Sequence, residues 1–312
     1  MKKWLGLVML FLTAFIWGTA FVAQSVGMDY VGPFTFNFSR YIVGSLVLIP
    51  FVVFNISRRK KALKNEPSLN EKIPAKKGLF NTYTKATVFG GIICGILLCV
   101  ASSLQQFGIL YSKAVGKAGF LTALYIIMVP LLGIIFGRKT KALIWICVAL
   151  ATLGLYLLCV KEGLHFEIGD IFLILCALVF SFHIMFIDFV SPRGDGVAIS
   201  CIQFAVSGVL CLICALVTER IVLTEILKGY IPILYAGVMS CGIAYTLQIL
   251  GQKYVEPTKA SLILCLESVF ATLGGWVILN QLLTLKETIG CIIVFIAIIL
   301  AQFVQKKENK TE

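Results

Sequence analysis

A few ionisable side chains in this sequence lie inside long apolar segments, where they are energetically costly. Glu267 lies about nine residues into the apolar segment 258–280, and Arg40 and His183 lie in two other segments of this kind. A charged group at the centre of a lipid bilayer costs about 2.5–3.5 kcal/mol on insertion scales. Each of these residues therefore indicates a binding, proton-carrying or structural role, because carboxylate, guanidinium and imidazole groups bind charged solutes or move protons.

Glu267 gives the most specific hypothesis. Nine residues of helix rise about 13 Å, which places this carboxylate near the middle of a hydrocarbon layer about 30 Å thick. We expect Glu267 to contact a cationic group of a substrate or to accept a coupling proton. The alternative is a structural carboxylate that is held by hydrogen bonds to its neighbours.

Arg40, His183 and Trp17 are further candidates. Arg40 lies near one end of its segment, shallow enough to reach the interface, so a tether between helix ends is preferred over substrate contact. For His183, a hydrogen bond to a neighbouring helix is preferred over proton relay. Trp17 lies in mid-segment and is expected to line a solute route. The following polar side chains could share this route or join helices to one another: Gln24, Asn37, Gln105, Gln106, Gln203 and Gln248.

The elements that carry these residues are predicted to be transmembrane helices. The chain of 312 residues is 59% hydrophobic and only 13% charged, which is too apolar for a water-soluble domain of this size. Its apolar blocks are continuous over about 20 residues, which favours spanning helices over barrel strands. Ten segments are predicted to span: 4–24, 35–56, 86–108, 114–137, 142–160, 169–188, 197–218, 230–251, 258–280 and 287–305.

The basic residues predict an orientation. With both termini in the cytoplasm, the inner segments carry 20 Lys and Arg residues and the outer segments carry 6. This bias agrees with the positive-inside rule. The segment 57–85 is the one long basic loop. The net charge of +12 does not indicate nucleic-acid binding, because no basic stripe is interleaved with aromatic residues.

The sequence predicts no enzyme chemistry and no cofactor. It lacks a P-loop, HExxH and GxSxG, so it cannot hydrolyse ATP itself. The 11 cysteines all lie in apolar blocks, where they pack as small hydrophobes, and no set of ligands with metal-site spacing completes Cys211 and Cys214.

An internal repeat divides the chain into two halves, 1–160 and 169–305. The stretch LQQFGILY at 104–111 matches LQILGQKY at 247–254, and KAGFL at 117–121 matches KASLI at 259–263. A duplicated unit with five spans must cross the membrane in opposite senses, which gives an inverted repeat typical of secondary transporters. The alignment pairs Tyr125 with Glu267, and both should face a cavity between the halves.

Several stretches resemble the EamA-type family of the drug/metabolite transporter superfamily. They are IWGTAFV at 16–22, FTFNFSRY at 34–41, KAGFLTALY at 117–125 leading to Val129-Pro130, SFH at 181–183, SPR at 191–193 and TKASLILCLESVF at 258–270. The resemblance implies a ten-helix protein of two EamA domains that moves metabolites, such as amino acids, across the bacterial inner membrane, often outward. This chain has Asn280-Gln281 where the family usually has Gly-Glu, so a role for that carboxylate is absent.

The sequence as a whole predicts an all-α integral membrane protein of ten helices in two inverted five-helix repeats. The favoured function is secondary transport of small polar metabolites, with a proton or another ion as a possible coupling partner. The alternatives are a membrane-embedded enzyme and a channel-like facilitator without alternating access. The expected partners are a small-molecule substrate and the lipid bilayer.

Overall fold

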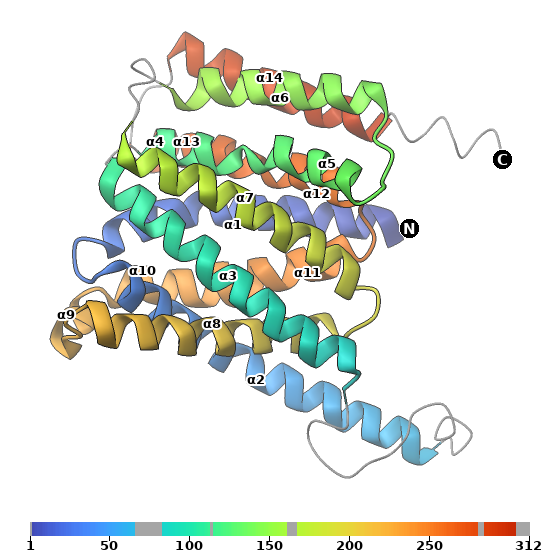
Figure 1. The fold of residues 1–312 in the computed structure, drawn as a ribbon, viewed down its shortest axis with the longest axis vertical. Helices are drawn as coiled ribbons and strands as arrows, with labels where there is room; N and C mark the ends of the chain where they lie inside the picture. Colours follow the sequence, from blue (N-terminus) through green and yellow to red (C-terminus); the bar gives the residue numbers. More distant parts are fainter. Residues whose placement is uncertain (1, 66–82, 113–114, 161–166, 280–283, 304–312) are drawn as a thin grey trace.

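The protein folds as a bundle of long helices, seen in the computed structural model that describes residues 2–65, 83–112, 115–160, 167–279 and 284–303 (Figure 1). The first helix begins and the last helix ends at the same end of the bundle. This end also carries the turn 136–141, which contains Arg138, Lys139 and Lys141. We therefore name it the basic end, and we name the opposite end the far end.

The first half contains five crossings. They are α1 (Lys2–Gly27), α2 (Pro33–Asn65), α3 (Lys85–Ser112), the pair α4 (Val115–Ala123) and α5 (Tyr125–Ile135), and α6 (Ala142–Cys159). Helix α2 continues to Asn65, beyond the predicted end of its span at 56, and the rest of the basic loop up to 82 lies outside the described residues. The pair α4 and α5 meets at Leu124, where the helix tightens because the Leu124 N–H donates to the Leu121 carbonyl at 3.3 Å.

The second half repeats this order with more breaks. Its elements are α7 (Ile168–Val190), α8 (Gly196–Thr218), the short α9 (Leu223–Lys228), the crossing formed by α10 (Tyr230–Tyr235), the π-helix η3 (Ala236–Tyr245) and α11 (Thr246–Gln252), the pair α12 (Pro257–Leu264) and α13 (Leu266–Leu279), and α14 (Leu285–Phe303). Neither α9 nor η3 was predicted from the sequence.

Ten crossings follow from these elements. Within the described residues, nine helical stretches are long and apolar enough to span a membrane by themselves. The tenth crossing is formed by the pair α12 and α13, which meets at Cys265. Its break matches the one at Leu124 in the first half, so the equivalent crossings of the two halves are both interrupted near mid-length.

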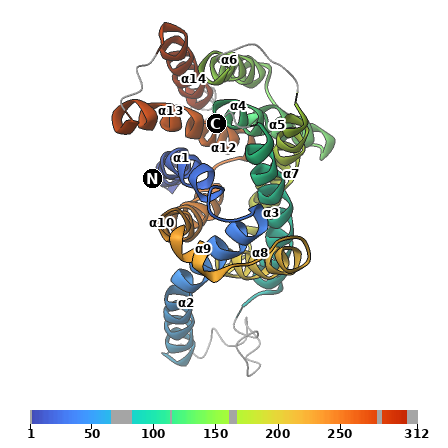
Figure 2. The ribbon, with the colours of Figure 1, turned by 90° about the vertical axis from the view of Figure 1, so that its left-hand side faces the viewer.

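The two halves are packed together by equivalent helix pairs. Helix α2 packs against α8, and helix α6 packs against α14 (Figures 1 and 2). The contact of α3 with α7 has its equivalent in the contact of α1 with α10, η3 and α11. Glycines allow the close approaches: a Cβ on Gly6 would lie 2.9 Å from the Gly251 carbonyl, and a Cβ on Gly290 would lie 2.7 Å from the Gly154 carbonyl. The predicted inverted repeat is confirmed by this pairing.

The bundle has apolar side chains outside and polar ones inside. Large apolar side chains such as Trp4, Phe51 and Phe89 are exposed around its surface. Polar groups such as Arg40, Gln106 and Ser181 are buried. This distribution suits lipid as the solvent, because lipid accepts apolar surface whereas polar groups need partners within the bundle.

Candidate functional site

A small cavity lies between the two halves. Its volume is about 30 Å³, enough for a water molecule or two. The residues that line it are Trp17, Phe21, Gln24, Arg40, Gln105, Thr122, Tyr125, Phe180, Ile184, Ser240, Tyr245, Gln248 and Glu267. Both halves contribute to this lining, so a movement of one half relative to the other would change the volume of this central cavity.

Glu267 and Tyr125 meet in this cavity. The Tyr125 hydroxyl donates a hydrogen bond of 3.1 Å to Glu267 Oε1, across 142 residues of sequence. Tyr125 is the first residue of α5 and Glu267 is the second residue of α13, so both side chains project from the start of a helix that begins inside the bundle. The positive end of the α13 dipole favours a carboxylate at this position.

Gly18 brings α1 close to the Glu267 backbone. A Cβ at position 18 would lie 2.6 Å from the Glu267 carbonyl oxygen, so only glycine permits this contact. The neighbouring Trp17 thereby lies against the cavity, where its ring packs 4.6 Å from the Tyr245 ring, centroid to centroid. Trp17 Nε1 has no hydrogen-bond partner among the described residues and remains a donor for a bound molecule.

Arg40 lies deep in the bundle, with 2% of its surface exposed. Its Nη1 donates to Gln24 Oε1 on α1 at 3.1 Å and its Nη2 donates to the Tyr41 hydroxyl at 3.2 Å. Within the described residues Arg40 has no acidic partner, and its Nε is unpaired. The prediction that Arg40 reaches the interface is therefore wrong. The reason is that α2 packs against α8 and η3, which turns this position inward.

His183 lies behind the cavity wall rather than in it. Its Nε2 and Gln203 Oε1 are 3.2 Å apart, which joins α7 to α8 by a hydrogen bond. The His183 ring meets the cavity residue Tyr245 edge-on, with centroids 6.2 Å apart. The hydrogen bond between helices matches the preferred interpretation of this residue, and the structure does not bring His183 into contact with the cavity.

The predicted polar lining divides into two groups. Gln24, Gln105 and Gln248 line the cavity, whereas Asn37, Gln106 and Gln203 do not. Gln105 and Gln248 are equivalent positions in the repeat, so the cavity contains a second pair of residues related by the duplication. The Gln248 Oε1 atom has no partner among the described residues and remains an acceptor.

Several cavity residues, above all Tyr245, were not predicted from the sequence. This residue ends the π-helix η3, and its ring contacts Trp17, His183 and Phe204. A π-helix adds residues to each turn and so changes the face on which later side chains appear. Tyr245 precedes the matching stretch 247–254 by two residues, which was the only available signal. The departure at Asn280-Gln281 lies outside the described residues.

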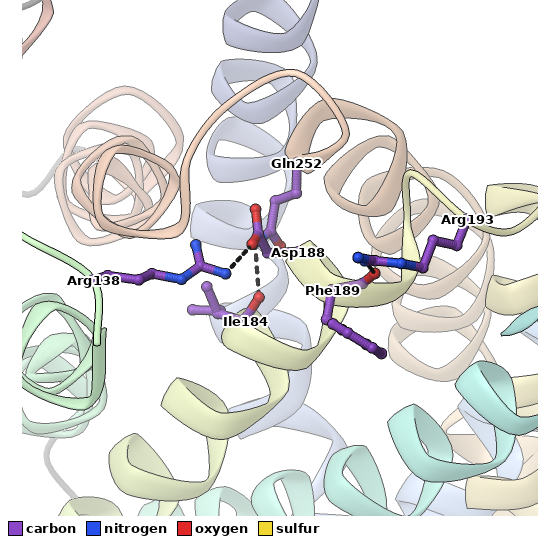
Figure 3. Close-up of polar contacts among 6 residues, drawn as sticks. All are labelled: Arg138, Ile184, Asp188, Phe189, Arg193 and Gln252. Carbon is purple, nitrogen blue, oxygen red and sulfur yellow. Dashed lines mark hydrogen bonds and ion pairs between the residues drawn. The ribbon is translucent and has the colours of Figure 1, made fainter. Parts of the chain in front are cut away.

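Different contacts join the halves at the two ends of the bundle. At the far end, the Glu219 carboxylate after α8 accepts hydrogen bonds from the N–H groups of Phe34 and Thr35, at 2.8 and 2.9 Å. At the basic end, Arg138 Nη2 and Asp188 Oδ2 form an ion pair of 2.6 Å between the turn after α5 and the end of α7 (Figure 3). Both contacts cross from one half to the other.

This architecture defines a class: a multi-pass membrane protein of two inverted five-helix halves with a small central cavity lined by both polar and apolar side chains. Residues 4–160 and 167–303 each match the model of the EamA-like transporter family. The chain belongs to this family, and it is a transporter rather than an enzyme. Within the described residues, no group of three or more His, Cys, Asp or Glu side chains is arranged to hold a metal ion.

Two relatives from other organisms are described as transporters. The chain is 26% identical to an uncharacterised transporter from Archaeoglobus fulgidus over 93% of this chain and 83% of the relative. It is 24% identical to an uncharacterised transporter from Clostridium kluyveri over 99% of this chain and 96% of the relative. One crystal structure superposes with a TM-score of 0.73 at 15% identity, covering 97% of this chain and 98% of the other, and supports the fold.

Proposed function

We propose that this protein is a secondary transporter, in the export direction, for small polar metabolites that carry both a cationic and an anionic group, such as amino acids. One observation carries the proposal. Arg40 and Glu267 line the same cavity between inverted halves, and neither has a partner of opposite charge within the described chain. A zwitterion would supply both missing charges.

The two charges come from different halves, Arg40 from α2 and Glu267 from α13. In the proposed complex, Glu267 accepts a hydrogen bond from the ammonium group of the solute. Arg40 donates to the carboxylate of the solute through Nε and the guanidinium N–H groups that do not bind Gln24 or Tyr41. Trp17 and Tyr245 provide the aromatic wall against the rest of the solute. Between transport cycles, Glu267 could instead carry a coupling proton.

Binding requires a conformation with a larger cavity. A volume of about 30 Å³ admits water but no amino acid, so a solute fits only after the cavity has widened. Rocking of the two inverted halves would open the cavity to one side at a time. The breaks at Leu124 and Cys265 are the places where α4 and α12 can change direction relative to α5 and α13.

The proposed orientation places both termini and the basic end in the cytoplasm of a bacterial cell. It rests on the Lys and Arg bias of 20 to 6. Export is the direction typical of the family that the sequence resembles.

Overexpression in bacteria with a survey of extracellular metabolites tests this proposal. Wild-type protein should raise the external level of at least one amino acid or related zwitterion. Glu267→Gln at the same membrane abundance should not, because the carboxylate charge is removed with its shape retained. Equal external levels in cells with wild-type protein, variant protein and empty vector would contradict the proposal. Accumulation of a modified lipid would be the outcome expected of an enzyme.

A further inference from the structure

A second and larger hollow lies at the basic end of the bundle. Its volume is about 490 Å³, and it is separate from the central cavity. Four basic side chains line it, Arg138, Lys139, Lys141 and Lys259, with Glu256 as the acid among its lining residues. The first three belong to the turn between α5 and α6 in the first half. Lys259 belongs to α12 and forms an ion pair of 3.7 Å with Glu256, so the excess positive charge comes from the first half.

The local backbone fixes the position of Arg138. Helix α5 ends in a turn at Gly137, whose φ of 78° suits glycine. The Arg138 N–H then donates to the Gly133 carbonyl at 2.8 Å, and the Gly137 N–H donates to the Ile134 carbonyl at 2.9 Å. Asp188 binds one nitrogen of the guanidinium at 2.6 Å, and 45% of the Arg138 side chain stays exposed. A guanidinium has five N–H donors, so Arg138 can bind a second anion while it keeps Asp188.

Two helix N-termini also meet this hollow. Helix α6 begins after Lys141 and α12 begins with Pro257, and neither start has a side-chain cap. The first N–H groups of a helix have no partner within that helix and attract anions, most strongly phosphate. Lysine and arginine side chains together with open helix starts favour a phosphate group over a cationic or neutral ligand.

Exposed apolar side chains flank the basic turn in sequence. Ile135 is 75% exposed, Phe136 is 62% exposed and Leu143 is 49% exposed, and all three belong to the segments that supply the basic residues. A soluble phosphate has no apolar part that would contact this surface, whereas the acyl chains of a phospholipid would cover it. We propose that this hollow binds the phosphate head group of an anionic phospholipid, with its acyl chains on Ile135, Phe136 and Leu143.

The bound lipid would join the two halves at the basic end. Its phosphate would contact the turn 138–141 of the first half and the start of α12 in the second half, beside the Arg138–Asp188 ion pair. A ligand that bridges both halves stabilises the conformer in which they are close. Anionic lipid would therefore favour the conformer closed at this end, whatever solute the central cavity carries.

Native mass spectrometry of the full-length protein tests this inference, with phosphatidylglycerol and phosphatidylcholine offered together. Wild-type protein should retain phosphatidylglycerol in preference, and Lys139→Ala/Lys141→Ala should lower this preference about tenfold. The matched control is Lys85→Ala/Lys253→Ala, which removes the same charge from exposed sites at the same end outside the hollow. This control should keep the wild-type preference, and Lys139→Arg/Lys141→Arg should keep most of it.

Three outcomes would overturn the inference. The first is an unchanged preference in Lys139→Ala/Lys141→Ala. The second is an equal loss in both alanine pairs, which would show attraction to the basic end as a whole. The third is displacement of phosphatidylglycerol by soluble glycerol 3-phosphate at millimolar concentration, which would identify a site for a soluble phosphate. Unchanged melting temperatures would show that the variants are folded.

Discussion

The fourth and ninth crossings are copies of one another with the same shape and different chemistry. Both break near mid-length, at Leu124 and Cys265, and both place a polar side chain at the start of the following helix. In the fourth crossing this side chain is Tyr125, and in the ninth it is Glu267. Duplication has preserved the backbone geometry of the cavity, whereas the charge is present in one copy only.

This difference shows how an inverted repeat can hold a solute in a defined orientation. A site with equal side chains from both halves would accept a solute in two opposite orientations. Here the second half supplies the anion Glu267 and the first half supplies the cation Arg40. If Glu267 and Arg40 bind the solute as proposed, their unequal charges set which end of the solute lies in which half.

The largest effect is expected for Glu267→Gln, which makes the ninth crossing as uncharged as the fourth. Transport of the identified solute should fall about 100-fold, corresponding to about 2.7 kcal/mol at a buried charge-assisted contact. Initial rates in proteoliposomes measure this effect. The matched control is Glu225→Gln, an exposed acid of α9 outside the central cavity and the hollow, which should transport at close to the wild-type rate. Equal rates for both variants would remove Glu267 from the account.

Arg40→Gln should have the next largest effect, a loss of about 30-fold. The variant removes the cation that lines the same cavity as Glu267 and leaves Gln24 and Tyr41 without their donor. Arg40→Lys should recover part of the rate, because the charge returns without the planar fork. Affinities for solutes with and without a carboxylate distinguish direct contact of Arg40 with the solute from an effect of Arg40 on the fold. If both solutes lose affinity equally, Arg40 acts through the fold and not through solute contact.

Tyr125→Phe should reduce transport by about tenfold. The change deletes the hydroxyl that donates to Glu267, and a hydrogen bond to a charged group contributes about 1.5–3 kcal/mol. The double variant Tyr125→Phe/Glu267→Gln should be little worse than Glu267→Gln alone, because the two side chains act on each other. Additive losses in this cycle of variants would contradict the pairing of the fourth and ninth crossings.

The smallest effect is expected at the basic end. Arg138→Ala and Asp188→Ala should each change the transport rate by no more than a few-fold, and the double variant should match either single one. The reason is that exposed ion pairs contribute about 0–1 kcal/mol, and 45% of the Arg138 side chain is exposed. Thermal unfolding and initial rates measure the coupling. A loss as large as that of Glu267→Gln would show that this end, rather than the cavity, limits transport.

Much of the fold could be predicted from the sequence because lipid imposes simple rules. Continuous apolar blocks of about 20 residues identified the ten crossings. The duplication of a unit with an odd number of crossings predicted the inverted halves. The repeat also predicted that Tyr125 and Glu267 face a cavity between the halves, and both line the central cavity. The hydrogen bond between them was not predicted.

The remaining features depend on packing that periodicity does not encode. The depth of Arg40 depends on which face of α2 meets α8 and η3, and the sequence alone left this face open. Tyr245 enters the cavity through a π-helix, whose extra residue per turn has no clear composition signal. The hollow at the basic end joins residues 138 and 259, far apart in sequence, through helix ends that only the folded bundle brings together.

The most direct test is counterflow in proteoliposomes that contain the wild-type protein and a panel of labelled amino acids and related zwitterions. The account predicts that vesicles preloaded with unlabelled solute take up the same labelled solute faster than empty vesicles, with saturation as its concentration rises. Glu267→Gln should abolish this stimulation. Uptake that stays linear with concentration and indifferent to the preloaded solute would contradict a carrier with a central binding site and would instead describe a channel.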